Sequence, residues 1–299
     1  ATVQEDLSWE NTNEYNFGIE FSLFNYSLNG ELDLYKRINN NAILPLQLPS
    51  TFGFDPFLSH VGKIINKGVE VSLNWTNKIN ENLSYNISTN ASYNQNELSE
   101  ISNQFFTNQI GGNINNGQFT KSVSVGQPLG SFFLYEVDGI DDRGQFVYKD
   151  LNDDGEVNEE DRRFFGSFIP SFTSSLNFKI NYKKFDFNLD TYGSFGNKVY
   201  NGKKAQRFGN ENIEQYVFNN RWTTARPSNT TSRASNNVPL SSDYFLESGD
   251  FVRINNITLG YSFDSAELKL INKIRFYITA KNPLIFKRFS GFTPEIAGD

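Results

Sequence analysis

The clearest feature of the sequence is a regular alternation of apolar and polar residues in two segments joined by a short turn. The apolar positions are Val69, Val71, Leu73 and Trp75 in residues 67–76, and Leu83, Tyr85, Ile87, Thr89, Ala91 and Tyr93 in residues 83–94. A period of two in both segments is typical of a β-hairpin. One face is apolar and the other carries Ser, Asn and Glu, as a wall between lipid and water requires.

The same alternation predicts six further strands, at residues 14–24, 28–37, 172–182, 185–196, 250–263 and 273–281. Short connections alternate with long ones, and the long ones are residues 38–65, 95–171 and 197–249. Antiparallel strands then place every short turn at one end, as in outer-membrane barrels. We therefore predict an all-β chain: an antiparallel transmembrane β-barrel, partial, about eight strands of a larger barrel, with long extracellular loops. A soluble β-sandwich is the alternative, although its strands are usually shorter.

Local signals refine this prediction. The apolar parity shifts at Asn255–Asn256, which indicates a β-bulge. Proline and glycine in residues 38–65 break any regular element, and a short helix is expected at residues 211–220. Residues 95–171 are too many for an ordinary loop, so this segment is expected to hold structure of its own.

Composition excludes several classes of function. The chain has no cysteine and one histidine, His60, so neither a disulfide framework nor a multi-histidine zinc site is available. The net charge is -7 and no run of Lys and Arg exceeds two residues, which argues against a nucleic-acid partner. No apolar stretch approaches the roughly 18 residues of a membrane helix. Nothing resembles a serine-hydrolase motif or a phosphate-binding loop, so we expect no enzyme.

An acidic segment in the second long connection has the spacing of an EF-hand calcium loop. The candidate metal ligands are Asp150, Asn152, Asp154, Glu156, Asn158 and Asp161, with Gly155 at the position of the sharp turn. Asp161 stands where a bidentate Glu is usual, and no flanking helices are evident. We predict a structural Ca²⁺ that pins the loop, while a solvated acidic turn is the alternative.

Several longer stretches resemble the C-terminal half of SusC/RagA-type TonB-dependent transporters of Bacteroidetes outer membranes. They are residues 66–73 (NKGVEVSL), 126–133 (GQPLGSFF), 137–140 (VDGI), 148–155 (YKDLNDDG), 196–201 (GNKVYN), 221–223 (RWT), 251–262 (FVRINNITLGYS) and 276–283 (FYITAKNP). The resemblance implies a barrel of about 22 strands in the cell outer membrane, in contact with its lipid. It also implies a SusD-like surface lipoprotein partner and TonB-energised import of oligosaccharides or oligopeptides.

Against this family the plug domain, the TonB-coupling part and the final strand are absent from residues 1–299. Eight strands with two free edges should not be stable alone in a bilayer, so the remaining barrel and plug segment are expected partners. The loop aromatics Trp222, Tyr216, Tyr244, Phe105 and Phe106 are candidate substrate contacts, or packing residues of the loops. A surface adhesion barrel without transport remains the rival function. A secreted glycan-active enzyme is disfavoured because no paired-carboxylate cleft is indicated.

Overall fold

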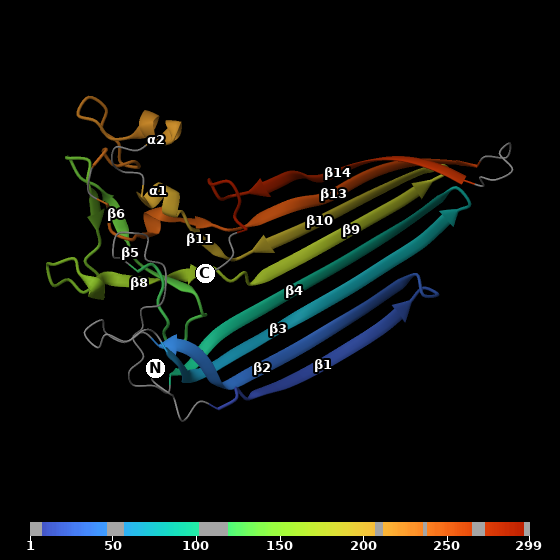
Figure 1. Cartoon of the computed structure of the whole chain (residues 1–299), viewed down its shortest axis with the longest axis horizontal. Helices are drawn as coiled ribbons and strands as arrows, with labels where there is room; N and C mark the ends of the chain where they lie inside the picture. The colour runs from blue at the N-terminus through green and yellow to red at the C-terminus, as the bar shows by residue number, and fades with distance from the viewer. Residues whose placement is uncertain are drawn as a thin grey trace.

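A twisted antiparallel sheet of eight long strands dominates the computed structural model, which describes residues 8–46, 57–101, 119–206, 212–235, 238–264 and 273–295 (Figure 1). In spatial order the strands are β1 (Thr12–Leu23), β2 (Leu28–Leu46), β3 (Phe57–Asn80), β4 (Leu83–Ile101), β9 (Phe172–Tyr182), β10 (Phe185–Phe195), β13 (Phe251–Asp264) and β14 (Lys273–Lys287). Every neighbouring pair is antiparallel. The predicted all-β antiparallel architecture is confirmed.

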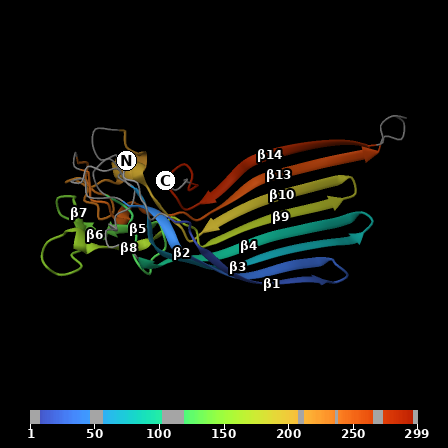
Figure 2. The ribbon, with the colours of Figure 1, turned by 60° about the horizontal axis from the view of Figure 1, so that its bottom comes forward.

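The connections segregate to the two ends of the sheet, as predicted. The turns after β1, β3 and β9 lie at one end, and the small elements of the long connections gather at the other (Figures 1 and 2). These elements are the strands β5 (Ser131–Tyr135), β6 (Val137–Ile140), β7 (Phe146–Tyr148), β8 (Arg162–Ser167), β11 (Lys198–Tyr200) and β12 (Leu246–Ser248), and the helices η2 (Glu159–Asp161), α1 (Gly202–Gln206), α2 (Gln215–Asn220) and η3 (Asp243–Phe245). The helix expected at 211–220 corresponds to α2.

The register of the strands confirms the two predicted faces. One continuous row across seven strands is apolar and consists of Leu28, Trp75, Ile87, Phe178, Leu189, Ile257 and Ala280. The neighbouring row points to the opposite face and is polar, with Asn29, Asn74, Ser88, Asn177, Asp190, Asn256 and Lys281. Since side chains alternate along each strand, the register keeps the two faces chemically separate.

The apolar face is not sealed inside a water-soluble core. Ile278 is 79% exposed, Phe17 60% and Leu259 53%, although all three belong to this face. The polar face is cross-linked instead: the Asn74 amide donates to Ser88 Oγ over 2.7 Å, and the Asn188 amide donates to Asp190. A sheet that is apolar outside and hydrogen-bonded inside matches the wall of a membrane barrel. None of the helices in the described ranges has the length and apolarity needed to cross a membrane.

Several predicted strand ends are wrong, and bulges explain those of β2, β3 and β14; β4 also runs past residue 94, to Ile101. Residues 38–46 and 57–65 were expected within a loop, yet β2 and β3 stay paired up to Leu46 and Phe57. Register shifts around Ala42 change the phase of the alternation there, so the sequence pattern hides the strand. The open tail expected from residue 282 begins later, because β14 continues to Lys287.

The predicted bulge at Asn255–Asn256 is confirmed by a register shift in both strand pairs that contain β13. In the paired strand β14, opposite this bulge, Asn282 has a φ of +47°. Pro283 follows directly, and a bulge is a place where a strand tolerates a residue without a backbone N–H. The bulge therefore allows β14 to continue past Asn282 and Pro283, two residues that would be expected to end a strand.

Candidate functional site

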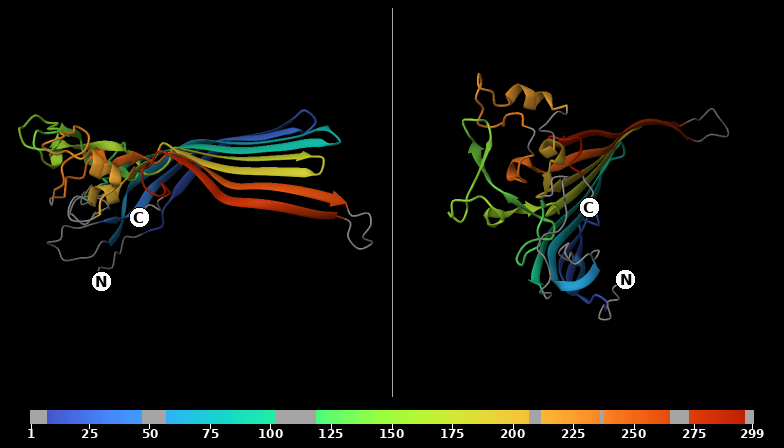
Figure 3. Two further views of the ribbon diagram at one scale, coloured as in Figure 1. Left: turned by 90° about the horizontal axis from the view of Figure 1, so that it is seen from above. Right: turned by 60° about the vertical axis from the view of Figure 1, so that its left-hand side comes forward.

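The two long connections pack together into one body, which we call the loop cluster: the described residues of 119–171 and 197–250. Figure 3 shows it at one end of the sheet in both views. Strands β5 and β8 pair within the first connection, and β11 pairs with β12 within the second. A bridge between Tyr135 and Ser242 joins the two connections, and the Val137 N–H donates to Asp243 Oδ1 over 2.9 Å.

An aromatic core holds the loop cluster together. Phe245 is 0% exposed, and its ring centroid lies 6.0 Å from that of Tyr200, 6.1 Å from Phe146 and 5.1 Å from Tyr244. Leu134 from β5 is equally buried. Aromatic pairs at these separations add to the gain from burial, so the long loops have a true hydrophobic core of their own.

Several buried polar groups in this core are paired, both across the two connections and within the first of them. The Leu240 N–H donates to the Tyr148 hydroxyl over 3.0 Å. Burial is the main cause that raises the pKa of Tyr148 to about 12, so this hydroxyl stays neutral. Glu136, mostly buried, accepts a hydrogen bond from Lys149 over 2.6 Å and forms an ion pair with Arg163 at 2.6 Å. Such networks fix one arrangement of the loops.

The acidic segment forms a tightly wound turn that its own side chains stabilise. The Asp150 carboxylate accepts the Gly155 N–H over 2.7 Å, and Asn152 and Asp154 accept further N–H groups of the turn. Gly155 has a φ of +89°, a conformation that favours glycine.

The far end of this turn is closed by a buried carboxylate. Asp161 accepts the N–H of Leu151 over 2.7 Å and that of Asn158 over 2.8 Å, and Asn158 Oδ1 accepts the Glu160 N–H. The bonds from Asn158 and Leu151 hold the pKa of Asp161 below its usual value. Among the described residues no three acidic or histidine side chains gather in metal-binding geometry, so the predicted Ca²⁺ stays a prediction.

The aromatic residues proposed from the sequence lie in different surroundings. Tyr216 on α2 is 65% exposed, whereas Tyr244 packs on Phe146 and carries the Lys204 ammonium 4.3 Å from its ring centroid. The Trp222 ring lies over Gly144, where an added Cβ would meet it at 2.6 Å. Phe105 and Phe106 lie outside the described residues. Trp222 and Tyr244 are thus half-buried with packing partners, and Tyr216 is the most exposed of the three.

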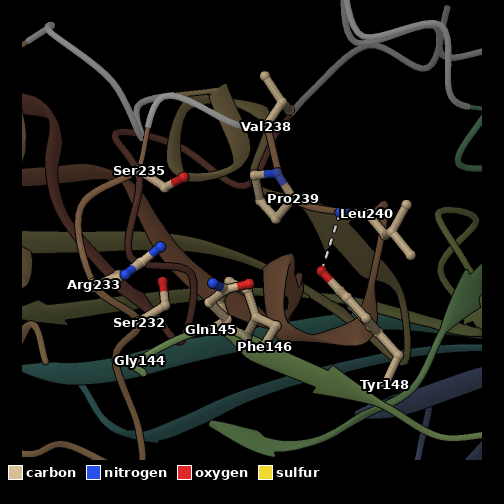
Figure 4. A pocket seen from close by; sticks show the side chains of 10 residues that line it. All are labelled: Gly144, Gln145, Phe146, Tyr148, Ser232, Arg233, Ser235, Val238, Pro239 and Leu240. Atoms are coloured by element: carbon tan, nitrogen blue, oxygen red, sulfur yellow. Dashed lines mark hydrogen bonds between the residues drawn. The ribbon is translucent and has the colours of Figure 1, made fainter. Parts of the chain in front are cut away.

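A pocket of about 220 Å³ opens between the β6–β7 hairpin and residues 232–235 and 238–240. Phe146, Tyr148, Val238, Pro239 and Leu240 supply apolar and aromatic surface, and Gln145, Ser232, Arg233 and Ser235 supply polar groups. Figure 4 shows the Arg233 side chain reaching toward the space between Gln145 and Ser235. The Arg233 backbone N–H donates to the Gly144 carbonyl over 2.8 Å and fixes its position.

Sequence reasoning did not single out Arg233 or Gln145. The two sides of the pocket are some ninety residues apart in the chain, and both lie in turn-rich segments without periodicity. The one signal available was an arginine in a segment with few acidic residues. Only the packing of the two connections shows that these residues share a site.

Comparisons with known proteins agree with the fold. No known protein family model matches the chain. It is 25% identical to a TonB-dependent receptor of Formosa agariphila and 27% identical to the TonB-dependent receptor SusC of Bacteroides thetaiotaomicron, over 98% of the chain in both cases. The RagAB peptide transporter structure matches 98% of the chain with a TM-score of 0.84 at 24% identity.

The extent of these matches is uneven. The chain spans about a third of each relative: 31% and 30% of the two receptors and 34% of the RagAB chain. The structural match supports the fold, and the receptors match almost the whole of the chain. Together with the two chemically distinct faces of its sheet, these matches confirm that the chain resembles SusC/RagA-type TonB-dependent receptors over almost its whole length.

Proposed function

We propose that this chain forms part of the barrel wall and the extracellular loops of an outer-membrane importer of oligosaccharides or oligopeptides. TonB supplies the energy, and a SusD-like surface lipoprotein sits over the loop cluster. The rest of the receptor contributes the other strands, the plug and the TonB contact. Outer-membrane lipid covers the apolar face of the sheet.

The observation that carries this proposal is the exposed apolar face of a sheet whose opposite face is lined with Asn, Ser and Asp. Such a sheet needs lipid on one side and a wet lumen on the other. A polar oligomeric solute suits this lumen, because amide and hydroxyl groups exchange hydrogen bonds with it. The relatives named SusC and RagAB support import, and the RagAB structure is described as a peptide transporter.

The test is uptake by cells that carry the complete receptor and its lipoprotein. Fluorescent malto-oligosaccharides and a casein peptide digest are supplied to cells with and without the receptor, in the presence and absence of an uncoupler. We expect accumulation inside the outer membrane that needs both the receptor and the proton gradient. Receptor-dependent binding that stays at the surface and ignores the uncoupler would instead support the rival function, a surface adhesion barrel.

Within the loop cluster, Tyr216 is the proposed aromatic contact to solute. Its ring is accessible, and an exposed tyrosine offers a flat apolar surface and a hydroxyl to a sugar or a peptide. A Tyr216→Ala receptor in the same uptake assay should raise the half-saturating concentration of the transported oligomer. Phe218→Ala is the matched control, since Phe218 is another exposed aromatic on the same helix.

We also propose that the acidic turn binds Ca²⁺ with Asp150, Asn152, Asp154, Glu156, Asn158 and Asp161. What supports this is the order of the oxygen-bearing residues and the left-handed Gly155 at the sixth position. Because Asp161 has a shorter arm than the usual Glu, affinity should be modest. The bound ion would hold the turn and take no part in transport chemistry.

Isothermal titration of Ca²⁺ into the chelator-treated receptor tests this second proposal. Binding of one ion that is lost in Asp150→Asn and kept in Glu159→Gln would support it, because Glu159 is not among the proposed ligands. Absence of heat up to millimolar Ca²⁺ would leave the solvated acidic turn as the explanation.

A further inference from the structure

The loop-cluster pocket contains a cation, the Arg233 guanidinium. In the described part of the chain, no carboxylate forms an ion pair with Arg233. Asp141 lies near enough for mutual attraction, but its carboxylate accepts the N–H groups of Arg143 and Gln145 over 2.9 and 2.7 Å. These bonds, with that of Gln145 first, lower the pKa of Asp141, so its carboxylate stays charged and attracts Arg233 from a distance without forming an ion pair with it.

The surroundings of Arg233 indicate what it could hold. A guanidinium presents parallel N–H donors that fit the two oxygens of a carboxylate. The Gln145 amide adds neutral donor and acceptor groups at the same opening, while Phe146 and Pro239 offer apolar surface. One guanidinium balances one negative charge, whereas a phosphate monoester brings nearly two. The lining therefore favours a carboxylate attached to a partly apolar body.

The volume sets the size of the bound group. About 220 Å³ equals the share of about seven liquid waters, at about 30 Å³ each. It is smaller than the pockets that enclose whole drug-sized ligands, which begin near about 300 Å³. One amino-acid residue or one sugar ring fits within this space, and the rest of an oligomer would extend out of the open pocket.

We propose that this pocket binds the carboxylate-bearing end residue of an imported oligomer, with Arg233 as its counter-ion. The carboxylate comes from the C-terminus of a peptide or from a uronic acid sugar. This inference rests on the proposed import function and narrows it: anionic-ended oligomers are preferred over neutral ones. The site lies in the loop cluster, before the solute reaches the lumen.

The experiment uses the purified complete receptor in detergent and four small probes. Acetyl-Ala-Leu is compared with its C-terminal amide, and methyl β-D-glucuronide with methyl β-D-glucoside, by ligand-detected NMR titration. We expect one carboxylate probe to bind at least about tenfold more tightly than its neutral match, the size typical of a charge-assisted pair. Whichever acid binds identifies the peptide or the uronate as the source.

Variants tie this preference to the pocket. Arg233→Gln and Arg233→Ala should bring the carboxylate probe down to the affinity of its neutral match. Arg226→Ala, which removes an exposed arginine from the neighbouring turn that does not line the pocket, should leave it unchanged. The thermal unfolding of each variant shows whether it folds. Because the two substitutions differ in size, the test remains decisive if only one of them folds.

The outcomes separate this site from the import function. Equal affinity for acids and neutral probes, or an unchanged preference in both Arg233 variants, overturns the site even where cells import oligomers. Retained, Arg233-dependent binding of a carboxylate probe by a receptor that shows no uptake supports the site and overturns the import function. Loss of the preference in Arg226→Ala as well would mean a general charge effect, and would also overturn the assignment.

Discussion

The sheet and the loop cluster use the same aromatic and aliphatic residues in opposite ways. On the sheet they stand exposed, as Ile278 and Phe17 do, which suits the lipid contact proposed above. In the loop cluster Phe245 and Leu134 are fully enclosed by protein. Exposure of apolar residues is therefore not a mark of loose structure in this chain. It distinguishes a surface suited to an apolar environment, the sheet, from a region that buries its own apolar residues, the loop cluster.

The largest expected effect comes from the core of the loop cluster. Phe245→Ala should lower the free energy of opening of this region by about 3–5 kcal/mol, because it leaves a cavity among packed rings. The sheet should keep its structure, since its strands do not depend on that core. Hydrogen exchange of the amides of residues 242–246, compared with those of β9, measures the difference.

Tyr216→Ala is the control for that change, and it should alter exchange by less than about 0.5 kcal/mol, as surface substitutions usually do. Equal loss of protection in β9 and in the loop cluster would contradict the division into two regions. It would mean that sheet and loops unfold as one unit.

The apolar face of the sheet provides the next test. Leu259→Arg near the middle of β13 should cost about 2–4 kcal/mol in the membrane, because the charge meets hydrocarbon. Thr258→Arg, one residue away on the polar face, should cost less than about 1 kcal/mol. The fraction of folded, heat-modifiable receptor in outer membranes measures both. Similar losses in the two variants would contradict the assignment of the faces.

Substitutions at two glycines of the loop cluster distinguish the cost of backbone strain from the cost of steric overlap. Gly144 and Gly126 both have positive φ, +78° and +83°, but only Gly144 has the Trp222 ring against it. Gly126→Ala should therefore cost the strain of a left-handed alanine, about 1–2 kcal/mol. Gly144→Ala should cost about 1–3 kcal/mol more, as overpacking does. Chemical unfolding followed by Trp fluorescence compares them, and equal costs would contradict the contact with Trp222.

The smallest effect is a dependence on pH in the acidic turn. The folded pKa of Asp161 is depressed, so its stabilising effect is complete above the unfolded value of about 3.9 and is lost as pH falls through the folded value. Protection of residues 150–161 against hydrogen exchange should stay level from neutral pH to about 4 and then decline. Asp161→Asn should lower protection throughout and remove this decline. If protection declined in the same way in Asp161→Asn, the titrating group would be another carboxylate.

Several features of the fold could be predicted from particular residues. The alternation from Val69 to Trp75 defined both a strand and its faces, because one side of the sheet must be apolar throughout. The parity shift at Asn255 was enough to locate a bulge. The extension of β2 and β3 was missed, since a bulge near Ala42 interrupts the periodicity while the backbone pairing continues.

The candidate site was less predictable. Local spacing drew attention to Asp150 and its neighbours, whose bonds form within a dozen residues. The pocket around Arg233 has no local signature, because its two sides come from different connections. Aromatic residues in loops, such as Trp222, could not be divided into packing and accessible ones without their contacts.

The sequence by itself determined that the chain forms a β-sheet with one apolar and one polar face, and that its long loops lie at the same end of the sheet. This follows because the strand period and the turn residues act over a few neighbouring positions. Only the tertiary structure decided that two distant loops share an aromatic core and leave Arg233 in an open pocket. Those contacts depend on how segments far apart in the chain pack against one another, and no local pattern encodes that packing.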